Sequence, residues 1–245
     1  MGIVLTMEST AAPKAMQSTS PVHRADKSFP GYPDRPKPTK RATRRRHTLI
    51  TVRQATREDC ARIARLFMIA SDGIAEYIWS RAGTSDLSLL EIGERRYART
   101  GTAFSYEHCL VAERDGAVVG MVHSFPMVEA PGDGSQAQAD PVLAPYAELE
   151  DYDSLYISGL AIFHDYRNLG IGTMLVKEAR RRGRGLGLER LSLICFEKNT
   201  KALRLYQRLG FRELRRRPVV PHPFLHYREG AAILLACPSD AFNVD

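Results

Sequence analysis

Arg167-Asn168-Leu169-Gly170-Ile171-Gly172-Thr173 is the stretch that decides the fold of this 245-residue chain. It follows an apolar segment at 155–163, which predicts a strand, and it precedes an amphipathic segment, which predicts a helix starting at Gly170. Glycines at such a junction let the backbone approach a ligand closely, and the helix N-terminus favours an anion. A Rossmann fingerprint needs a third glycine where this chain has Leu175, and the lysine of a Walker A loop is absent.

The segments around this loop predict alternating strands and helices. Asp115-Gly116 indicates a tight hairpin turn, and Thr56 followed by Asp59 is typical of a helix start. An antiparallel front followed by strand–helix–strand crossovers predicts a mixed α/β fold, with a mixed sheet covered by helices. We expect strands at 48–55, 109–114, 117–125, 155–163, 191–196, 211 onward and 231–237, and helices at 60–68, 86–99, from 170 onward and at 202–209.

Composition excludes several classes of protein. With 44% apolar and 26% charged residues, the chain is neither disordered, nor collagen-like, nor a small disulfide scaffold. The sequence contains no run of 18 apolar residues, so it predicts no membrane-spanning helix. The four cysteines are far apart without a CxxC pair, which favours free thiols and a cytoplasmic location. His164, His222 and His226 match no metal-binding spacing, so no metal site is expected.

The net charge of +7 comes from the N-terminal segment, residues 1–47, which hold 10 Lys and Arg against 3 Asp and Glu. This segment is also rich in proline and serine, so we expect a disordered basic tail followed by one domain at 48–240. A solvated tail is the first interpretation. A transit peptide, a basic patch at Arg41–Arg46 that binds nucleic acid, and a myristoylation signal at Gly2 remain open.

Charge is unevenly divided within the domain itself. Residues 167–228 hold 16 Lys and Arg against 4 Asp and Glu, whereas residues 115–166 hold 9 Asp and Glu and no Lys or Arg. The basic half suits a polyanionic cofactor, and the acidic half suits a cationic partner. Much of the acidity lies in a loop insert expected at 127–153.

Three motifs together resemble the GNAT superfamily of N-acetyltransferases. Arg167-x-x-Gly170-x-Gly172 resembles the family's acyl-CoA motif, and Asn199-x-x-Ala202-x-x-Leu205-Tyr206-x-x-x-Gly210-Phe211 is similar to its next motif. Val52-Arg53-x-Ala55-Thr56-x-x-Asp59 resembles the family's first strand and helix. The resemblance covers about residues 49–237 and excludes the tail and the acidic insert.

The resemblance implies a three-layer αβα fold whose mostly antiparallel sheet contains one splayed parallel strand pair, here 155–163 and 190–197. Acetyl-CoA would be the cosubstrate and would lie in the gap between these strands. Backbone groups of Leu160, Ala161 and Ile162 would pair with its pantetheine arm, and Asn199 would hydrogen-bond the arm or cap a helix. The pyrophosphate would be held by the main chain of the remaining predicted cofactor residues, Arg167, Asn168, Leu169, Gly170, Ile171, Gly172 and Thr173.

The resemblance also implies direct acetyl transfer to a primary amine in a ternary complex. Tyr206 would lie near the sulfur and protonate the leaving thiolate, unless it is an ordinary core aromatic residue. Because an amine with a pKa of about 10.4 is protonated at pH 7, the site must remove a proton. The candidates for the base are the acids that lead into the central strand, with Glu150 taken as the catalytic one beside Glu148, Asp151 and Asp153. Ser158 could relay the proton through water.

The acceptor is expected to be a small molecule or a peptide, bound between the first two helices near Asp72, Glu76, Tyr77 and Trp79. The oligomeric state stays open, although the resemblance favours a homodimer. We expect no binding of nucleic acid or membrane by the domain. Three other functions stay open. They are a GNAT-like module that binds acyl-CoA or a partner without turnover, a dinucleotide-dependent oxidoreductase, and nucleic-acid binding through the tail.

Overall fold

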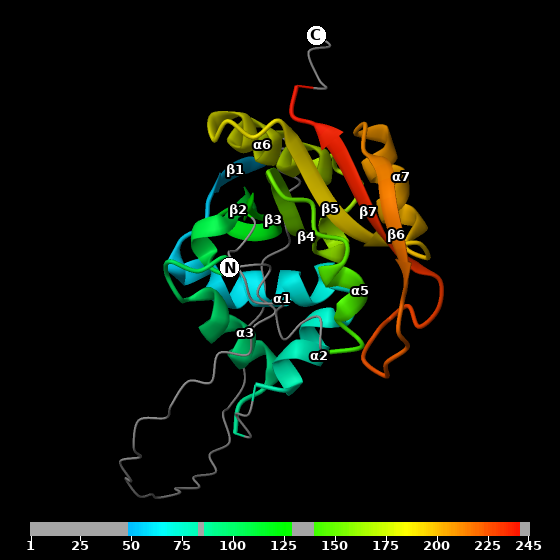
Figure 1. The fold of residues 1–245 in the computed structure, drawn as a ribbon. Coiled ribbons are helices and arrows are strands. Elements are labelled where there is room, and N and C mark those ends of the chain that lie inside the picture. The colour runs from blue at the N-terminus through cyan, green and yellow to red at the C-terminus, as the bar shows by residue number, and fades with distance from the viewer. Residues whose placement is uncertain (1–48, 83–85, 129–139, 241–245) are drawn as a thin grey trace, which may run out of the picture. The chain divides into compact units, whose positions relative to one another are not determined.

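The computed structural model describes residues 49–82, 86–128 and 140–240 (Figure 1). The predicted tail and residues 129–139 of the predicted insert lie outside these ranges. The strands are β1 (Thr51–Gln54), β2 (Cys109–Arg114), β3 (Ala117–Met127), β4 (Ser154–Ile162), β5 (Arg190–Phe196), β6 (Arg212–Pro218) and β7 (Ala231–Pro238). The helices are α1 (Cys60–Ala70), α2 (Ile74–Ser80), α3 (Leu89–Tyr97), α5 (Ala144–Ala147), α6 (Ile171–Gly185) and α7 (Thr200–Arg208), with short 3-10 turns at Arg57–Asp59, Tyr106–His108 and His164–Tyr166.

The strands form one seven-stranded sheet in the order β1-β2-β3-β4-β5-β7-β6. Only β4 and β5 run parallel among these neighbours, and all other pairs are antiparallel. Residues of α1, α2 and α3 pack in one apolar core, while those of α6 and α7 pack in a second core with other side chains of the sheet. Helices therefore cover both faces of the sheet (Figure 1), which confirms the predicted three-layer fold.

Local sequence signals explain several of these elements. Asp115 and Gly116 both have positive φ, 54° and 74°, as a type I′ turn requires, and they join β2 to β3. The Asp59 carboxylate accepts a hydrogen bond from the Thr56 amide at 2.8 Å, directly before α1. Both predictions are thus confirmed.

Two helices were absent from the sequence prediction, α2 and α5. The first has seven residues and the second has four, so each is too short to show a clear apolar period. Residues Ala75, Tyr77, Ile78 and Trp79 of α2 are all buried, which leaves little polar face to reveal a helix. Packing against α1 and α3 therefore determines α2 more than its own sequence does.

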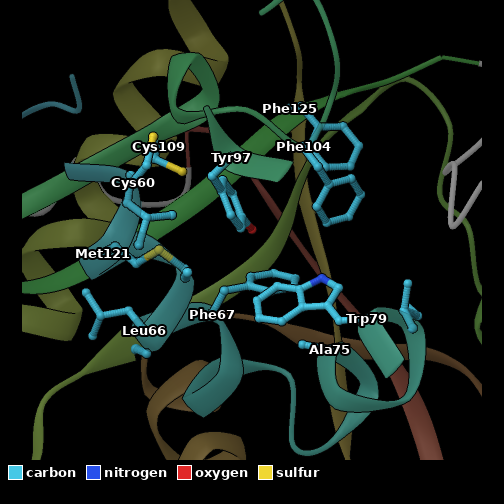
Figure 2. Packing of buried hydrophobic residues seen from close by; sticks show 14 of the residues in the cluster. Cys60, Leu66, Phe67, Ala75, Trp79, Tyr97, Phe104, Cys109, Met121 and Phe125 are labelled. Carbon is cyan, nitrogen blue, oxygen red and sulfur yellow. The ribbon is translucent and has the colours of Figure 1, made fainter. Parts of the chain in front are cut away.

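The first core is rich in aromatic side chains. The Phe67 ring lies 6.1 Å from the Trp79 ring and 5.8 Å from the Phe104 ring, measured between centroids. Figure 2 shows these three residues gathered with Tyr97 beside α1 and α2. In the second core the buried Arg180 guanidinium donates to the Leu209 carbonyl at 3.1 Å, which ties α6 to the end of α7.

The parallel pair separates part-way along its length. Pairing of β4 with β5 runs from Ser154 to Ile157 on β4 and stops there. The register of β4 against β3 shifts at the same point, so that Ser158 is an extra residue in the strand. A gap therefore opens between the second halves of β4 and β5, as the resemblance implied. None of the helices described is long and apolar enough to cross a membrane.

Candidate active site

The loop at 167–173 presents a row of backbone donors. Asn168 and Gly170 have positive φ, 63° and 77°, which turns the chain sharply into α6. Within the described part of the chain, the amides of residues 168–173 donate no hydrogen bond, and the first to do so is Met174, to the Gly170 carbonyl at 3.1 Å. Such unpaired amides at a helix N-terminus form an anion site.

A groove of about 650 Å³ runs from this loop to α7. It is lined by all the predicted loop residues except Leu169, which is itself exposed. Four cationic side chains line it as well, namely Arg167, Lys198, Lys201 and Arg208. Lys198 pairs with Glu229 at 3.1 Å, whereas Lys201 and Arg208 form no ion pair within the described ranges. Both the backbone and the side chains of this groove therefore suit a diphosphate.

The β4 backbone beside the gap offers two of the three predicted residues. The Phe163 amide donates to the Val119 carbonyl at 2.9 Å, so Phe163 bonds toward β3. Because backbone direction alternates along a strand, Ala161 also bonds toward β3, while Leu160 and Ile162 direct their amides and carbonyls into the gap. The Ile162 carbonyl already accepts from Arg167 Nε at 3.2 Å.

A second cavity lies beside this groove, between α1, α2, α5 and the separated ends of β4 and β5. Tyr206 lies where the groove and this cavity meet. Its side chain is only 8% exposed and packs edge-on against Phe211, with 5.6 Å between ring centroids. Its hydroxyl makes no hydrogen bond with any described residue. Burial raises the pKa of Tyr206 above its ordinary value, and nearby Cys195 and Asp72 raise it further. The hydroxyl therefore stays protonated and can donate a proton.

Asn199 has the capping role that sequence left open. Its side-chain oxygen accepts from the Ala202 amide at 3.3 Å at the start of α7, and its Nδ2 donates to Asp72 Oδ2 at 3.0 Å. The second Nδ2 hydrogen is available to a ligand, because Asn199 lines the groove.

Asp72 is a partly buried carboxylate at the same junction. Its side chain is 16% exposed, and His226 Nδ1 lies 3.7 Å from its Oδ1. Burial raises the pKa of Asp72, although the hydrogen bond from Asn199 and the nearby His226 lower it in part. Neighbouring Gly73 fixes the position of this turn, because a Cβ there would clash with the Phe224 carbonyl oxygen.

Ser158 faces the second cavity but is tied to a histidine that the sequence analysis missed. His123 is fully buried, and its Nε2 donates to the Ala103 carbonyl at 2.9 Å. Its Nδ1 therefore accepts, from Ser158 Oγ and, at 3.4 Å, from the Tyr97 hydroxyl. Burial lowers the pKa of His123 to about 3, so the ring is neutral and a weak base.

The acidic side chains after residue 139 are largely engaged with arginines. Arg217 Nε donates to Glu148 at 2.5 Å, and Arg190 pairs with Asp151 at 3.2 Å. Glu150 lines the cavity, and its Oε2 accepts from the Tyr152 hydroxyl at 2.6 Å. Of the acidic residues that the sequence singled out, Glu150 and Asp72 line the cavity. Asp72 alone among them also lines the groove.

The cavity has a volume of about 160 Å³ and lies between α1, α2, α5 and the open ends of β4 and β5. Six residues line both the cavity and the groove: Ile69, Asp72, Leu160, Asn199, Ala202 and Tyr206. An acyl group carried along the groove would therefore reach the cavity beside Tyr206, Asp72 and the Leu160 amide. Among the described residues, no group of three or more side chains is arranged to hold a metal ion.

Two groups gave no sequence signal: Tyr146, which lines the cavity, and His123, which contacts the cavity residue Ser158. His123 stands in an apolar strand, and its contact with Ser158 depends on the irregular register of β4. Tyr146 belongs to the unpredicted helix α5. The positions of both side chains depend on contacts with residues that are distant in the sequence, and no motif or spacing predicts such contacts.

A family model described as "Acetyltransferase (GNAT) family" matches residues 76–211, more than half of the chain. The chain belongs to the GNAT acetyltransferase family. This confirms the resemblance and supports acetyl transfer as its general activity. Among curated proteins, none matches the sequence significantly.

Solved structures of GNAT proteins share the fold. An N-acetyltransferase from Staphylococcus aureus is 23% identical, with a TM-score of 0.53 over 76% of this chain and 100% of that one. An acetyltransferase from Salmonella typhimurium, solved with its cofactor acetyl-CoA, is 20% identical, with a TM-score of 0.50 over 79% and 95%. A ribosomal-protein-alanine N-acetyltransferase from Brucella melitensis is also 20% identical, with a TM-score of 0.50 over 77% and 99%. At these identities the likeness concerns the fold.

Proposed function

We propose that this GNAT protein transfers an acetyl group from acetyl-CoA directly to a primary amine. The observation that carries the proposal is the junction at Tyr206, where an anion-binding groove meets a separate cavity large enough for an acceptor. Two substrates can thus be bound together, one on each side of a buried acid, as a ternary complex requires.

The chain's residues suit the cofactor. The free amides at 168–173 would hold the diphosphate, and Lys201 and Arg208 would add positive charge along the groove. Leu160 and Ile162 would hydrogen-bond the pantetheine arm, with Asn199 as a further donor. We propose no backbone contact from Ala161, because its amide and carbonyl bond toward β3. Bound acetyl-CoA supplies the activated acetyl thioester.

Acetyl transfer then requires three catalytic roles of the protein. The Leu160 amide would hydrogen-bond the acyl oxygen as negative charge develops on it. Tyr206 would donate its hydroxyl proton to the departing thiolate; its raised pKa means that the hydroxyl is protonated until a negatively charged sulfur lies beside it. A base would take a proton from the ammonium group of the acceptor, either directly or through water.

We propose Asp72 as this base, ahead of Glu150 and Ser158. Asp72 lines both compartments, and burial raises its pKa toward the range in which a carboxylate accepts a proton more readily. The Ser158 hydroxyl points its proton at His123, whose pKa of about 3 makes it a poor end point for a relay. Glu150 lines the cavity but not the groove, so it suits a role in binding the acceptor.

The test compares wild type with Tyr206→Phe. The hydroxyl has no protein partner, so its removal should leave stability and acetyl-CoA affinity nearly unchanged, as measured by thermal melting and titration calorimetry. Thiol release in the presence of amines should fall by roughly 10²–10⁴-fold, the range for general acid catalysis. Unchanged thiol release would contradict the role of Tyr206. A wild-type protein that binds acetyl-CoA but acetylates no amine would favour the non-catalytic module.

The proposal extends to the setting of the enzyme. Cys60, Cys109, Cys195 and Cys237 are all buried free thiols, which supports a reducing compartment such as the cytoplasm. We also keep as proposals a homodimer and a single domain at 48–240. Light scattering on the full chain and on residues 48–245 would test both.

A further inference from the structure

The cavity beyond Tyr206 is walled by rings. Phe67, Trp79, Phe104, Tyr146, Tyr156 and Phe196 all line it, and they come from six different segments of the chain. Figure 2 shows three of them, Phe67, Trp79 and Phe104, lying close together. Trp79 is also the only tryptophan of the whole chain. An apolar, aromatic wall of this kind favours a ligand with a matching apolar body.

Two polar groups lie within this aromatic setting. The Tyr146 hydroxyl is buried and has no hydrogen-bond partner within the described residues. Asp72 lines the same cavity, and its negative charge adds to the effect of burial, which raises the pKa of Tyr146. A buried hydroxyl without a partner is rare, because it loses its hydrogen bonds to water. An ammonium group bound in this cavity could use either oxygen as an acceptor, the Tyr146 hydroxyl or the Asp72 carboxylate.

We propose that the acceptor is a compact amine that carries one ring, with the ring against the aromatic wall and the amine at Asp72. This rests on the acetyl transfer proposed above. The cavity of about 160 Å³ is close in size to an engineered apolar cavity of about 150 Å³ that binds benzene.

The same geometry disfavours other amines. The second ammonium of a polyamine would have Glu150 as the one remaining carboxylate among the lining residues, and the backbone of a peptide would lose hydrogen bonds to water there. Glu150 is the other carboxylate in the wall, and its Oε2 already accepts from Tyr152. Arg96 lies over the Phe104 ring at 5.0 Å and adds a positive charge, which further disfavours a second cation.

The first experiment uses Trp79 as an internal probe of the cavity. The full-length protein, saturated with coenzyme A so that no reaction occurs, is titrated with 2-phenylethylamine under selective excitation of tryptophan. A saturable change in emission is expected. 2-Phenylethanol, which keeps the ring and lacks the amine, should bind about tenfold or more weakly because Asp72 and Tyr146 stay unsatisfied. No response of Trp79 to 2-phenylethylamine, or equal binding of the alcohol, would overturn the proposal.

A matched pair of variants locates the ligand. Ala147 lines the cavity, whereas Ala144 is on the same helix and does not line it. Ala147→Leu should raise the Kd for 2-phenylethylamine by about tenfold or more, since added carbons occupy the space of the ring. Ala144→Leu should leave it unchanged, and neither variant should alter acetyl-CoA affinity. Equal effects of the two variants would contradict a ligand in this cavity.

Turnover separates this proposal from the function on which it rests. With acetyl-CoA, thiol release for 2-phenylethylamine should exceed that for spermidine or an alanyl peptide by roughly 100-fold in kcat/KM. If spermidine or the peptide is acetylated faster, the ring-bearing acceptor is wrong and acetyl transfer stands. If Trp79 reports binding of 2-phenylethylamine but no amine is acetylated, the ligand site stands and acetyl transfer is wrong.

Discussion

Thr173 offers the sharpest test of the cofactor loop, because one added charge should act in opposite directions on stability and on binding. Gly170 caps α6, so Thr173 is its third residue, and it lines the groove. An aspartate in the first turn of a helix interacts favourably with the helix dipole, by about 0.3–1 kcal/mol. Thr173→Asp should therefore raise the melting temperature of the free protein by roughly 1–4 °C.

The same carboxylate should oppose the diphosphate of acetyl-CoA. Two negative charges at about 5 Å from the new one, in a dielectric close to that of water, are repelled by about 1.7 kcal/mol. This corresponds to a Kd raised by roughly 15-fold. Thr173→Asn is the matched control, because it has nearly the same size and no charge.

Titration calorimetry and thermal melting of both variants, at low and high salt, check this reasoning. We expect the Asp variant to bind acetyl-CoA more weakly than the Asn variant, and the difference to shrink as salt screens the charges. Equal affinities of the two variants at low salt would refute the assignment of the diphosphate to residues 167–173. A melting temperature lowered by Asp alone would refute the account of the helix N-terminus.

Three further outcomes are expected. Burial raises the folded-state pKa of Asp72, so this group stabilises the fold below its unfolded pKa and loses that contribution as pH rises through the folded value. Asp72→Asn should therefore raise the melting temperature at pH 7, with the gain fading toward about pH 4, while amine acetylation falls roughly 10²-fold or more; a lowered melting temperature at pH 7 would contradict this. Arg180→Met should lower the free energy of unfolding by about 1.5–3 kcal/mol in urea denaturation, because the buried Leu209 carbonyl loses a charged donor. Arg181 is exposed, so Arg181→Met should change the free energy of unfolding by less than about 0.5 kcal/mol. Similar losses for the two variants would refute the role of Arg180. Gly73→Ala should cost far more melting temperature than Gly116→Ala, since only the first Cβ meets a backbone atom within 4 Å, and equal losses would show that the clash is relieved.

The sequence predicted the elements whose signals are local. The hairpin at Asp115-Gly116 needs only two residues with positive φ, and the loop at 167–173 needs only glycines between a strand and a helix. Helix α2 could not be predicted in this way. It is short, and most of its side chains are buried in the core that it shares with α1 and α3, so its sequence shows no clear apolar period. The loop at 167–173 is such a local motif, and its turn from a strand into helix α6 is where the sequence predicted it; its role in binding the cofactor stays a prediction.

The catalytic and acceptor groups depend instead on contacts between distant segments. Asp72 gains its raised pKa from burial at a junction that α7 and the segment with His226 help to form. Ser158 was predicted as a proton relay and lines the cavity, but its partner His123 lies on another strand and was not predicted. Spacing in one sequence carries no record of such encounters, so the residue types were foreseen and their pairings were not.

The charge division of the domain shows how a net charge can indicate one ligand and mislead about another. Lys201 and Arg208 of the basic half line the groove, as expected for a polyanionic cofactor. Glu148 and Asp151 of the acidic half are instead paired with Arg217 and Arg190. Those pairs tie the connection before β4 to β6 and β5, so their charge is largely neutralised. If the acceptor is cationic, as proposed, its attraction is then concentrated in carboxylates within the cavity, where salt screens poorly. Ionic strength should accordingly act mainly on the affinity for acetyl-CoA, and much less on that for the amine.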